Sequence, residues 1–134
     1  MNSLEHQFQF FADVPSVPTS ESFRTSESVA ISDDVLSYLW PTFNWLREGQ
    51  GLNRYGVTVF HQSDAIELSA ILVGWIALIK CAPPNFDLPS GYDTSNDTFV
   101  FIRVEKESLL STLRKLYQWC LETGPNGGIV HWGI

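Results

Sequence analysis

Three histidines are the side chains of this sequence best suited to acid–base or metal chemistry near neutral pH. His61 closes a predicted strand with Asp64 shortly after it, and His131 lies in a predicted strand near the C-terminal end. If these two strands were neighbours, His61, His131 and Asp64 would form a metal or acid–base cluster. We favour the alternative in which backbone groups or water satisfy each ring, because spacing fixes no third ligand or nucleophile. His6, near the N-terminus, is expected to be exposed.

The familiar catalytic and cofactor motifs are missing from the sequence. It contains no GxxxxGK(S/T) phosphate loop, no GxGxxG after a strand, no CxxC or HExxH metal pattern and no GxSxG elbow. The stretch from Asp93 to Asp97 lacks the turn glycine and the terminal glutamate of a calcium loop. We therefore predict no catalytic residues, no metal and no cofactor. A small hydrolase or metal-dependent enzyme using His61, His131 and Asp64 is the alternative.

The connector at 82–97 is rich in proline and aspartate and is the stretch most similar to a recognition surface. A loop of this length without its own secondary structure is uncommon in a compact domain and is often functional. Tyr92 offers an anchor, and Asp87, Asp93 and Asp97 would steer a basic partner. The alternative for this stretch is a solvated loop.

Two tryptophans extend the predicted partner-binding surface. Trp45 and Trp119 lie toward the C-terminal ends of predicted helices, and partial exposure there would make them the weaker candidates of this surface. The alternative for both, which we favour, is ordinary packing beneath a helix.

Composition limits the classes of function. The chain has 134 residues, of which 44% are hydrophobic, and this predicts one domain with one core. The formal net charge is −7, and the scattered basic residues argue against binding to nucleic acid or to an anionic membrane. The acidic balance suits a basic protein partner, although solubility is the simpler explanation. Cys81 and Cys120 make no disulfide framework, and no signal-peptide pattern is visible, so the protein is expected to be cytoplasmic.

The predicted elements alternate between strand and helix. Strands are predicted at 6–14, 55–61, 98–104 and 129–132, helices at 32–46, 63–83 and 107–122, and a solvated loop at 16–28. This order predicts one α+β domain over residues 1–134, with a mixed sheet of four or five strands packed with three main helices. The first and last strands are expected at the sheet edges, the strand at 98–104 in its interior, and Pro41 is expected to kink or split the first helix.

The longest apolar run, Leu68 to Ile79, lies in the second predicted helix and is apolar on nearly every side. Such a helix is either a core helix or a membrane span. A span needs about 20 apolar residues, and this run is shorter, with Glu67 and Lys80 at its ends. We therefore expect the most buried helix of the fold, with Trp75 in the core.

Four short segments resemble small bacterial immunity proteins, which neutralise secreted toxins in polymorphic and contact-dependent toxin systems. They are Tyr55-Gly56-Val57-Thr58, Ser63-Asp64-Ala65-Ile66, Gly74-Trp75 and the ending Gly128-Ile129-Val130-His131-Trp132-Gly133-Ile134. The resemblance implies a small acidic cytoplasmic inhibitor without catalytic residues, and it transfers no functional residue by position. We expect a non-catalytic binding protein that occludes a basic surface of a protein partner, with an oligomeric scaffold protein as a further alternative.

Overall fold

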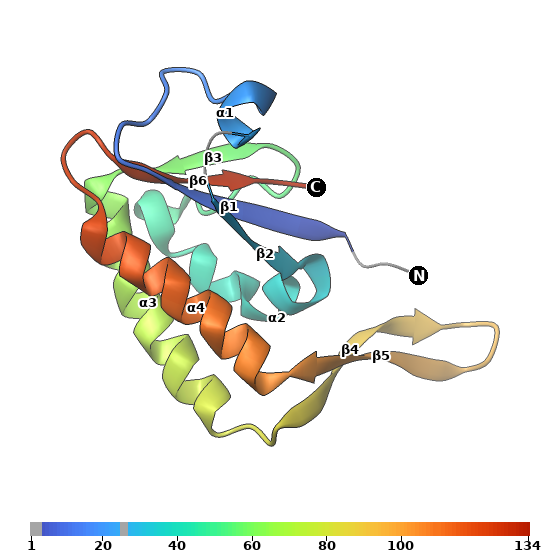
Figure 1. Ribbon diagram of the computed structural model, residues 1–134. Coiled ribbons are helices and arrows are strands. Elements are labelled where there is room, and N and C mark those ends of the chain that lie inside the picture. Colours follow the sequence, from blue (N-terminus) through green and yellow to red (C-terminus); the bar gives the residue numbers. More distant parts are fainter. Residues whose placement is uncertain (1–3, 25–26) are drawn as a thin grey trace.

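The computed structural model describes residues 4–24 and 27–134 and has an α+β architecture. A four-stranded antiparallel sheet is covered by three long helices, and a two-stranded hairpin projects from the body (Figure 1). The predicted fold class, the single domain and the three main helices are confirmed.

The elements fall into a main sheet, three long helices, a hairpin and two short helical segments. The main sheet contains β1 (Glu5–Phe11), β2 (Ser28–Ser32), β3 (Val57–Phe60) and β6 (Gly128–Trp132). The long helices are α2 (Asp33–Phe43), α3 (Gln62–Lys80) and α4 (Lys106–Glu122). The hairpin consists of β4 (Asn85–Asp93) and β5 (Thr98–Glu105). Two short helical segments, α1 (Ser20–Arg24) and η1 (Leu46–Gly49), complete the set.

The sheet order is β2-β1-β6-β3, and every pairing in the described sheet is antiparallel. The predicted mixed sheet is therefore wrong. Between β3 and β6 the chain leaves the sheet along α3, passes through the hairpin and returns along α4. It therefore enters β6 antiparallel to β3. The predicted edge positions are also wrong, because β1 and β6 are the two central strands.

Helix α3 is only partly buried, although the sequence predicted the most buried helix. Its inner face packs into the core through residues at helical spacing: Ala65, Leu68, Leu72, Trp75 and Ile79. Its outer face is apolar yet exposed, as at Val73 and Leu78. By length and composition alone α3 could cross a membrane, but its inner face is built into the core of the domain.

Helix α2 begins at a cap and ends near its proline. The Ser32 hydroxyl accepts a hydrogen bond from the Val35 backbone N–H at 3.3 Å, which satisfies a free donor of the first turn. Pro41 lies in the last turn, and the helix stops at Phe43 rather than continuing to Leu46 as predicted. The helix therefore continues for two residues past Pro41, which removes one bond of the ladder at the Ser37 carbonyl.

Both predicted loops contain secondary structure. The stretch at 82–97 contains β4, so most of it is half of a hairpin. The stretch at 16–28 contains α1, whose Phe23 packs edge-on against Trp132 with ring centroids 5.6 Å apart, and residues 25–26 lie outside the described structure.

Candidate functional site

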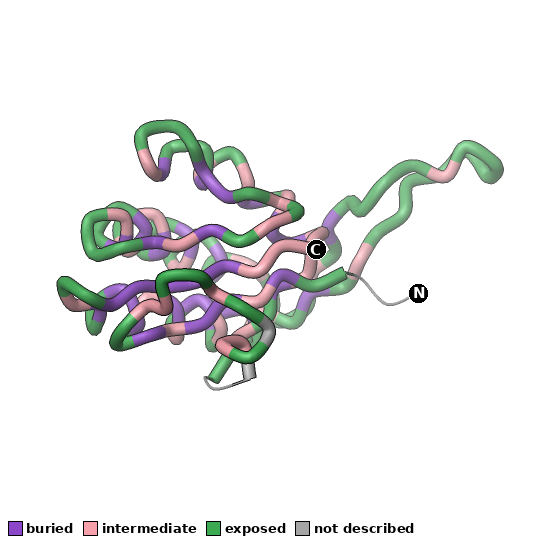
Figure 2. The backbone as a smooth tube through the Cα atoms, turned by 90° about the horizontal axis from the view of Figure 1, so that it is seen from above, coloured by how far each residue is buried: buried purple, intermediate pink, exposed green. Residues whose placement is uncertain are grey.

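The β4–β5 hairpin, residues 85–105, forms an arm that extends away from the body of the domain (Figures 1 and 2). Its base is held by Leu88 and Val104, which are buried in the core. Toward the tip the arm is exposed over most of its length (Figure 2). Both of its long edges lack a further strand among the described residues. An isolated two-stranded hairpin is only marginally stable in water, so the arm depends on its base or on a partner.

One face of the arm carries a row of exposed aromatic side chains. Tyr92 pairs with Phe99 across the strands in a T-shaped contact at 5.1 Å, and Phe101 follows at 6.5 Å from Phe99. Their exposed fractions are 48% for Tyr92, 64% for Phe99 and 56% for Phe101. Large aromatic side chains grouped in this way are typical of the centre of a protein–protein interface. We call these three residues the aromatic row.

The tip of the arm is shaped by Asp93. Its Oδ1 accepts a hydrogen bond from the Ser95 backbone N–H at 2.9 Å, and its Oδ2 accepts one from the Asn96 side chain at 2.7 Å. The hydrogen bond from Asn96, followed by that from the Ser95 N–H, lowers the pKa of this carboxyl. Asp97 closes the turn at φ 52°, a conformation that aspartate tolerates better than most residues. Both carboxylate oxygens of Asp93 therefore serve to hold the turn.

The arm is acidic overall. It contains one basic residue, Arg103, and four acidic residues: Asp87, Asp93, Asp97 and Glu105. Arg103 pairs with Asp87 at 3.3 Å on the same face as the aromatic row. Asp97 makes no ion pair with any residue that the structure describes. The aromatic row is therefore flanked by net negative charge, which favours a basic partner.

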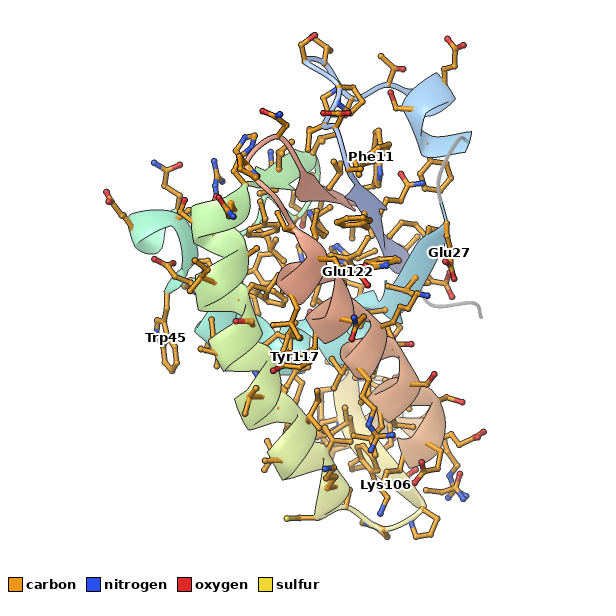
Figure 3. The ribbon with its side chains drawn as sticks, turned by 60° about the vertical axis from the view of Figure 1, so that its left-hand side comes forward. Phe11, Glu27, Trp45, Lys106, Tyr117 and Glu122 are labelled. Carbon is orange, nitrogen blue, oxygen red and sulfur yellow. The ribbon has the colours of Figure 1, made fainter. Side chains whose placement is uncertain are left out.

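The structure brings together four of the six predicted partner-binding residues. Asp87, Tyr92, Asp93 and Asp97 all lie on the arm. Trp45 is exposed but lies beside α3, where it points away from the body (Figure 3). It therefore belongs to a different surface.

Trp119 is buried, so the partial exposure that would place it on this surface does not occur. Its ring stacks on Phe10 with centroids 6.3 Å apart, and the Lys115 ammonium lies 5.8 Å from its centroid. The residue faces the sheet from the last turns of α4 and presents little surface to a partner.

Sequence reasoning missed Phe99 and Phe101 as surface residues. Both lie in the strand that was predicted to be in the sheet interior, because it is apolar on both faces. Its pairing partner β4 contains Pro89 and Gly91, with a register shift between them, and those residues indicated a loop. A turn signal at 93–97 between two strand-length segments was the available clue to the hairpin.

The cluster of His61, His131 and Asp64, which was the less favoured alternative from the sequence, does not form. Strands β3 and β6 are indeed neighbours, but the residue opposite His131 is Thr58. His61 is exposed at the start of α3, where its backbone N–H donates to Asp64 Oδ2 at 3.3 Å. His61 and Asp64 are thus capping residues, since the carboxylate satisfies a free N–H at the helix start.

His131 instead belongs to a buried relay with His6, which was expected to be exposed and is fully buried. His6 Nδ1 lies 2.8 Å from His131 Nε2, and His6 Nε2 lies 2.8 Å from Asp33 Oδ1. Asp33 also accepts a hydrogen bond from Arg54 Nε at 3.1 Å. Arg54 in turn bonds the Ser37 hydroxyl and covers the Trp40 ring at 5.0 Å. The relay therefore links the two central strands to the start of α2.

One proton position in this relay follows from its acceptor. A carboxylate can only accept, so His6 Nε2 donates to Asp33, and His6 Nδ1 shares a hydrogen bond with His131 Nε2. His131 Nδ1 is buried without a hydrogen-bond partner among the described residues. Desolvation, with a smaller contribution from the nearby His6, lowers the pKa of His131 to about 3.

The relay is suited to holding the fold and not to catalysis. Both rings are fully buried, and the exposed end is a carboxylate already bound by Arg54.

No group of three or more metal-ligating side chains with a metal-site arrangement occurs in the described parts of the chain. Comparisons with family models, with curated proteins and with solved structures find no match for this chain. The arm is therefore the feature on which a functional proposal rests.

Proposed function

We propose that this protein is a non-catalytic binding protein whose arm engages a basic protein partner. The observation that supports the proposal is the aromatic row of Tyr92, Phe99 and Phe101, exposed on a hairpin that leaves the body of the domain. A soluble domain gains little from presenting three adjacent aromatic rings to water, whereas burial in an interface makes them anchors. The surrounding negative charge would raise the encounter rate with a basic surface.

The kind of partner is proposed from the sequence features. Resemblance to small bacterial immunity proteins suggests that the partner is a cognate toxin, which the arm would occlude in the cytoplasm. An inhibitor of this type needs fast capture and slow release. Acidic residues such as Asp97 would raise the association rate, because charges at the rim of an interface act mainly on association. The aromatic rings, once buried in the interface, would lower the dissociation rate.

Site-specific photo-crosslinking tests where the partner binds. A photo-reactive amino acid replaces Phe99 on the arm, and a matched variant carries it at Tyr55, which is exposed on the body. In extracts of the native host, the Phe99 position should capture one protein with a basic surface, and the Tyr55 position should not. Identification of that protein as a toxin domain, encoded in the neighbouring open reading frame, would support the immunity function. Equal capture at both positions would refute the arm as the binding surface, and an unrelated metabolic neighbour would remove the immunity proposal.

Charge removal at the tip should slow association while the backbone turn is kept. Asparagine at position 93 keeps one side-chain oxygen for the Ser95 N–H and loses the bond from the Asn96 side chain, and asparagine at position 97 tolerates the positive φ. Asp93→Asn with Asp97→Asn should lower the association rate with the captured partner severalfold and flatten its dependence on salt. The control Glu107→Gln with Glu122→Gln removes the same charge from α4 and should change the rate much less. Equal effects of the two pairs would show that only net charge matters.

A further inference from the structure

The two long edges of the arm differ in how far they are open to a further strand. Strand β4 contains Pro89, which has no backbone N–H, and its register with β5 shifts between Pro89 and Gly91. At this point the Ser90 hydroxyl donates to Asp34 of α2 at 2.8 Å, so the body of the domain lies against β4. Proline, a bulge and cover by a neighbouring element are common means by which proteins block an exposed strand edge. The edge of β4 is therefore interrupted.

The edge of β5, by contrast, is continuous. Its 8 residues, Thr98–Glu105, include no proline or glycine, and the register shift falls on the β4 side of the ladder. Within the described parts of the chain, residues 98–103 form backbone hydrogen bonds only with β4. Every second residue of a paired strand turns its N–H and C=O away from that neighbour. Strand β5 therefore presents unpaired backbone donors and acceptors along its outer edge.

Apolar side chains lie on both faces of β5 beside this edge. Phe99 and Phe101 of the aromatic row are on one face, and Val100 and Ile102 alternate with them on the other. Val100 is 47% exposed and Ile102 is half-buried. At the base of the arm, residues 102–105 line a pocket of about 220 Å³ together with β2 and α4. A strand laid along the edge would cover apolar side chains on both faces, and this pocket leaves room for its end.

We propose that an extended segment of the basic partner adds to the outer edge of β5 as a third strand of the arm. The proposal rests on the function proposed above and specifies how the arm binds. Backbone hydrogen bonds to β5 supply affinity, and the side chains on the two faces supply specificity. Basic side chains of the segment lie against the rings of Phe99 and Phe101. β-Branched side chains of the segment pack beside Val100 and Ile102.

The charge of the arm favours a basic segment over a second copy of this chain. Two arms paired edge to edge would bring together two sets of the same four acids with only one Arg103 each, and like charges on paired strands are destabilising. A basic segment instead meets opposite charge. A third strand also brings the arm to the number of strands at which a sheet can be stable.

A defined peptide with this alternation tests the proposal. The probe is a blocked peptide of alternating arginine and valine, as long as the 8 residues of β5. It is titrated to about 1 mM, the range of weak binding, against the full-length ¹⁵N-labelled protein, and amide signals are followed by NMR spectroscopy. Amides at 98–103 should shift most. Amides of β3, which is an edge strand of the main sheet, should stay in place.

Two matched peptides separate strand pairing from charge. The same peptide N-methylated at every residue keeps its side chains and charge but has no backbone donor. It should bind at least about tenfold more weakly, because several backbone hydrogen bonds are lost together. A peptide of alternating glutamate and valine keeps the backbone donors and reverses the charge, so it should shift no amide of the arm.

Four results would overturn strand addition by a basic segment. They are no binding of the arginine peptide up to about 1 mM, equal binding of its N-methylated form, equal binding of the glutamate peptide, and shifts spread equally over β3 and β5. Each is distinct from failure of the proposed function, which capture at Phe99 decides. A basic protein captured there, together with any of these four results, would keep the arm as the binding surface and remove the third strand.

Discussion

The two buried histidines of this protein are explained by each other and not by their neighbours in sequence. His6 and His131 lie 125 positions apart and share a hydrogen bond, and Asp33 ends their relay. Helical or strand periodicity cannot reveal such a pair, because it describes faces within one element. His61 was the more attractive candidate because Asp64 follows it closely, yet that spacing serves a helix cap.

The lowered pKa of His131 predicts that the free energy of unfolding falls as pH is lowered. Its pKa is about 3 in the folded protein, against about 6.5 in an unfolded chain. Between these values the unfolded state binds a proton that the folded state does not, so stability is fully present above about pH 6.5 and decreases below it. From pH 7.5 to pH 5 the loss should reach about 2 kcal/mol, and urea unfolding at both pH values measures it.

Two variants show whether His131 causes this pH dependence. His131→Phe fills a similar volume and removes the titrating ring, so most of the decrease between pH 7.5 and pH 5 should disappear. This variant should also be less stable at pH 7.5 by about 1–3 kcal/mol, because His6 Nδ1 loses its partner. His61→Phe changes an exposed histidine and should retain the original pH dependence. An unchanged slope in His131→Phe would show that other groups control the acid response.

At the scale of elements, the sequence predicted which segments are helices or strands, but not which of their faces are buried. Helix α3 and strand β5 were both identified, and both were predicted to be buried because they are apolar on both faces. In the structure α3 buries one face and exposes the other, whereas β5 buries only Val104 near its base and is exposed on both faces toward the tip. An apolar residue on an exposed face has the same sequence signal as one that faces the core. The sequence pattern therefore identifies the buried face only where the opposite face is polar.

A pair of leucine substitutions on α3 measures which face is buried. Leu72→Ala should lower the free energy of unfolding by about 2–5 kcal/mol, because it leaves a cavity where the side chain is fully buried. Leu78→Ala should change it by less than about 0.5 kcal/mol, since that side chain is exposed on the same helix. Both are measured by urea unfolding. Equal losses would mean that the outer face is covered.

At the scale of the whole molecule, the fold class, the three helices and the single domain followed from the alternating pattern, whereas the topology did not. Strand order depends on long-range pairing, as when β6 inserts between β1 and β3. The arm escaped prediction for a related reason: its strands pair only with each other, so no core periodicity marks β4. The result is a body with one packed core and two exposed apolar surfaces, the aromatic row and the outer face of α3.

This division predicts two levels of stability, which native-state hydrogen exchange can separate. Amides at 91–100 lie beyond Ser90, whose hydroxyl still donates to Asp34 at the start of α2, so their hydrogen bonds should open locally while the body stays folded. Amides of the central strand β6, whose residues are buried, should exchange only through global unfolding and should respond strongly to denaturant. Arm amides should respond weakly in the free protein and gain protection when the arm is bound to its partner. If they exchange at the rate of β6 in the free protein, the arm is part of the cooperative unit, and its exposed aromatic row is already rigid before binding.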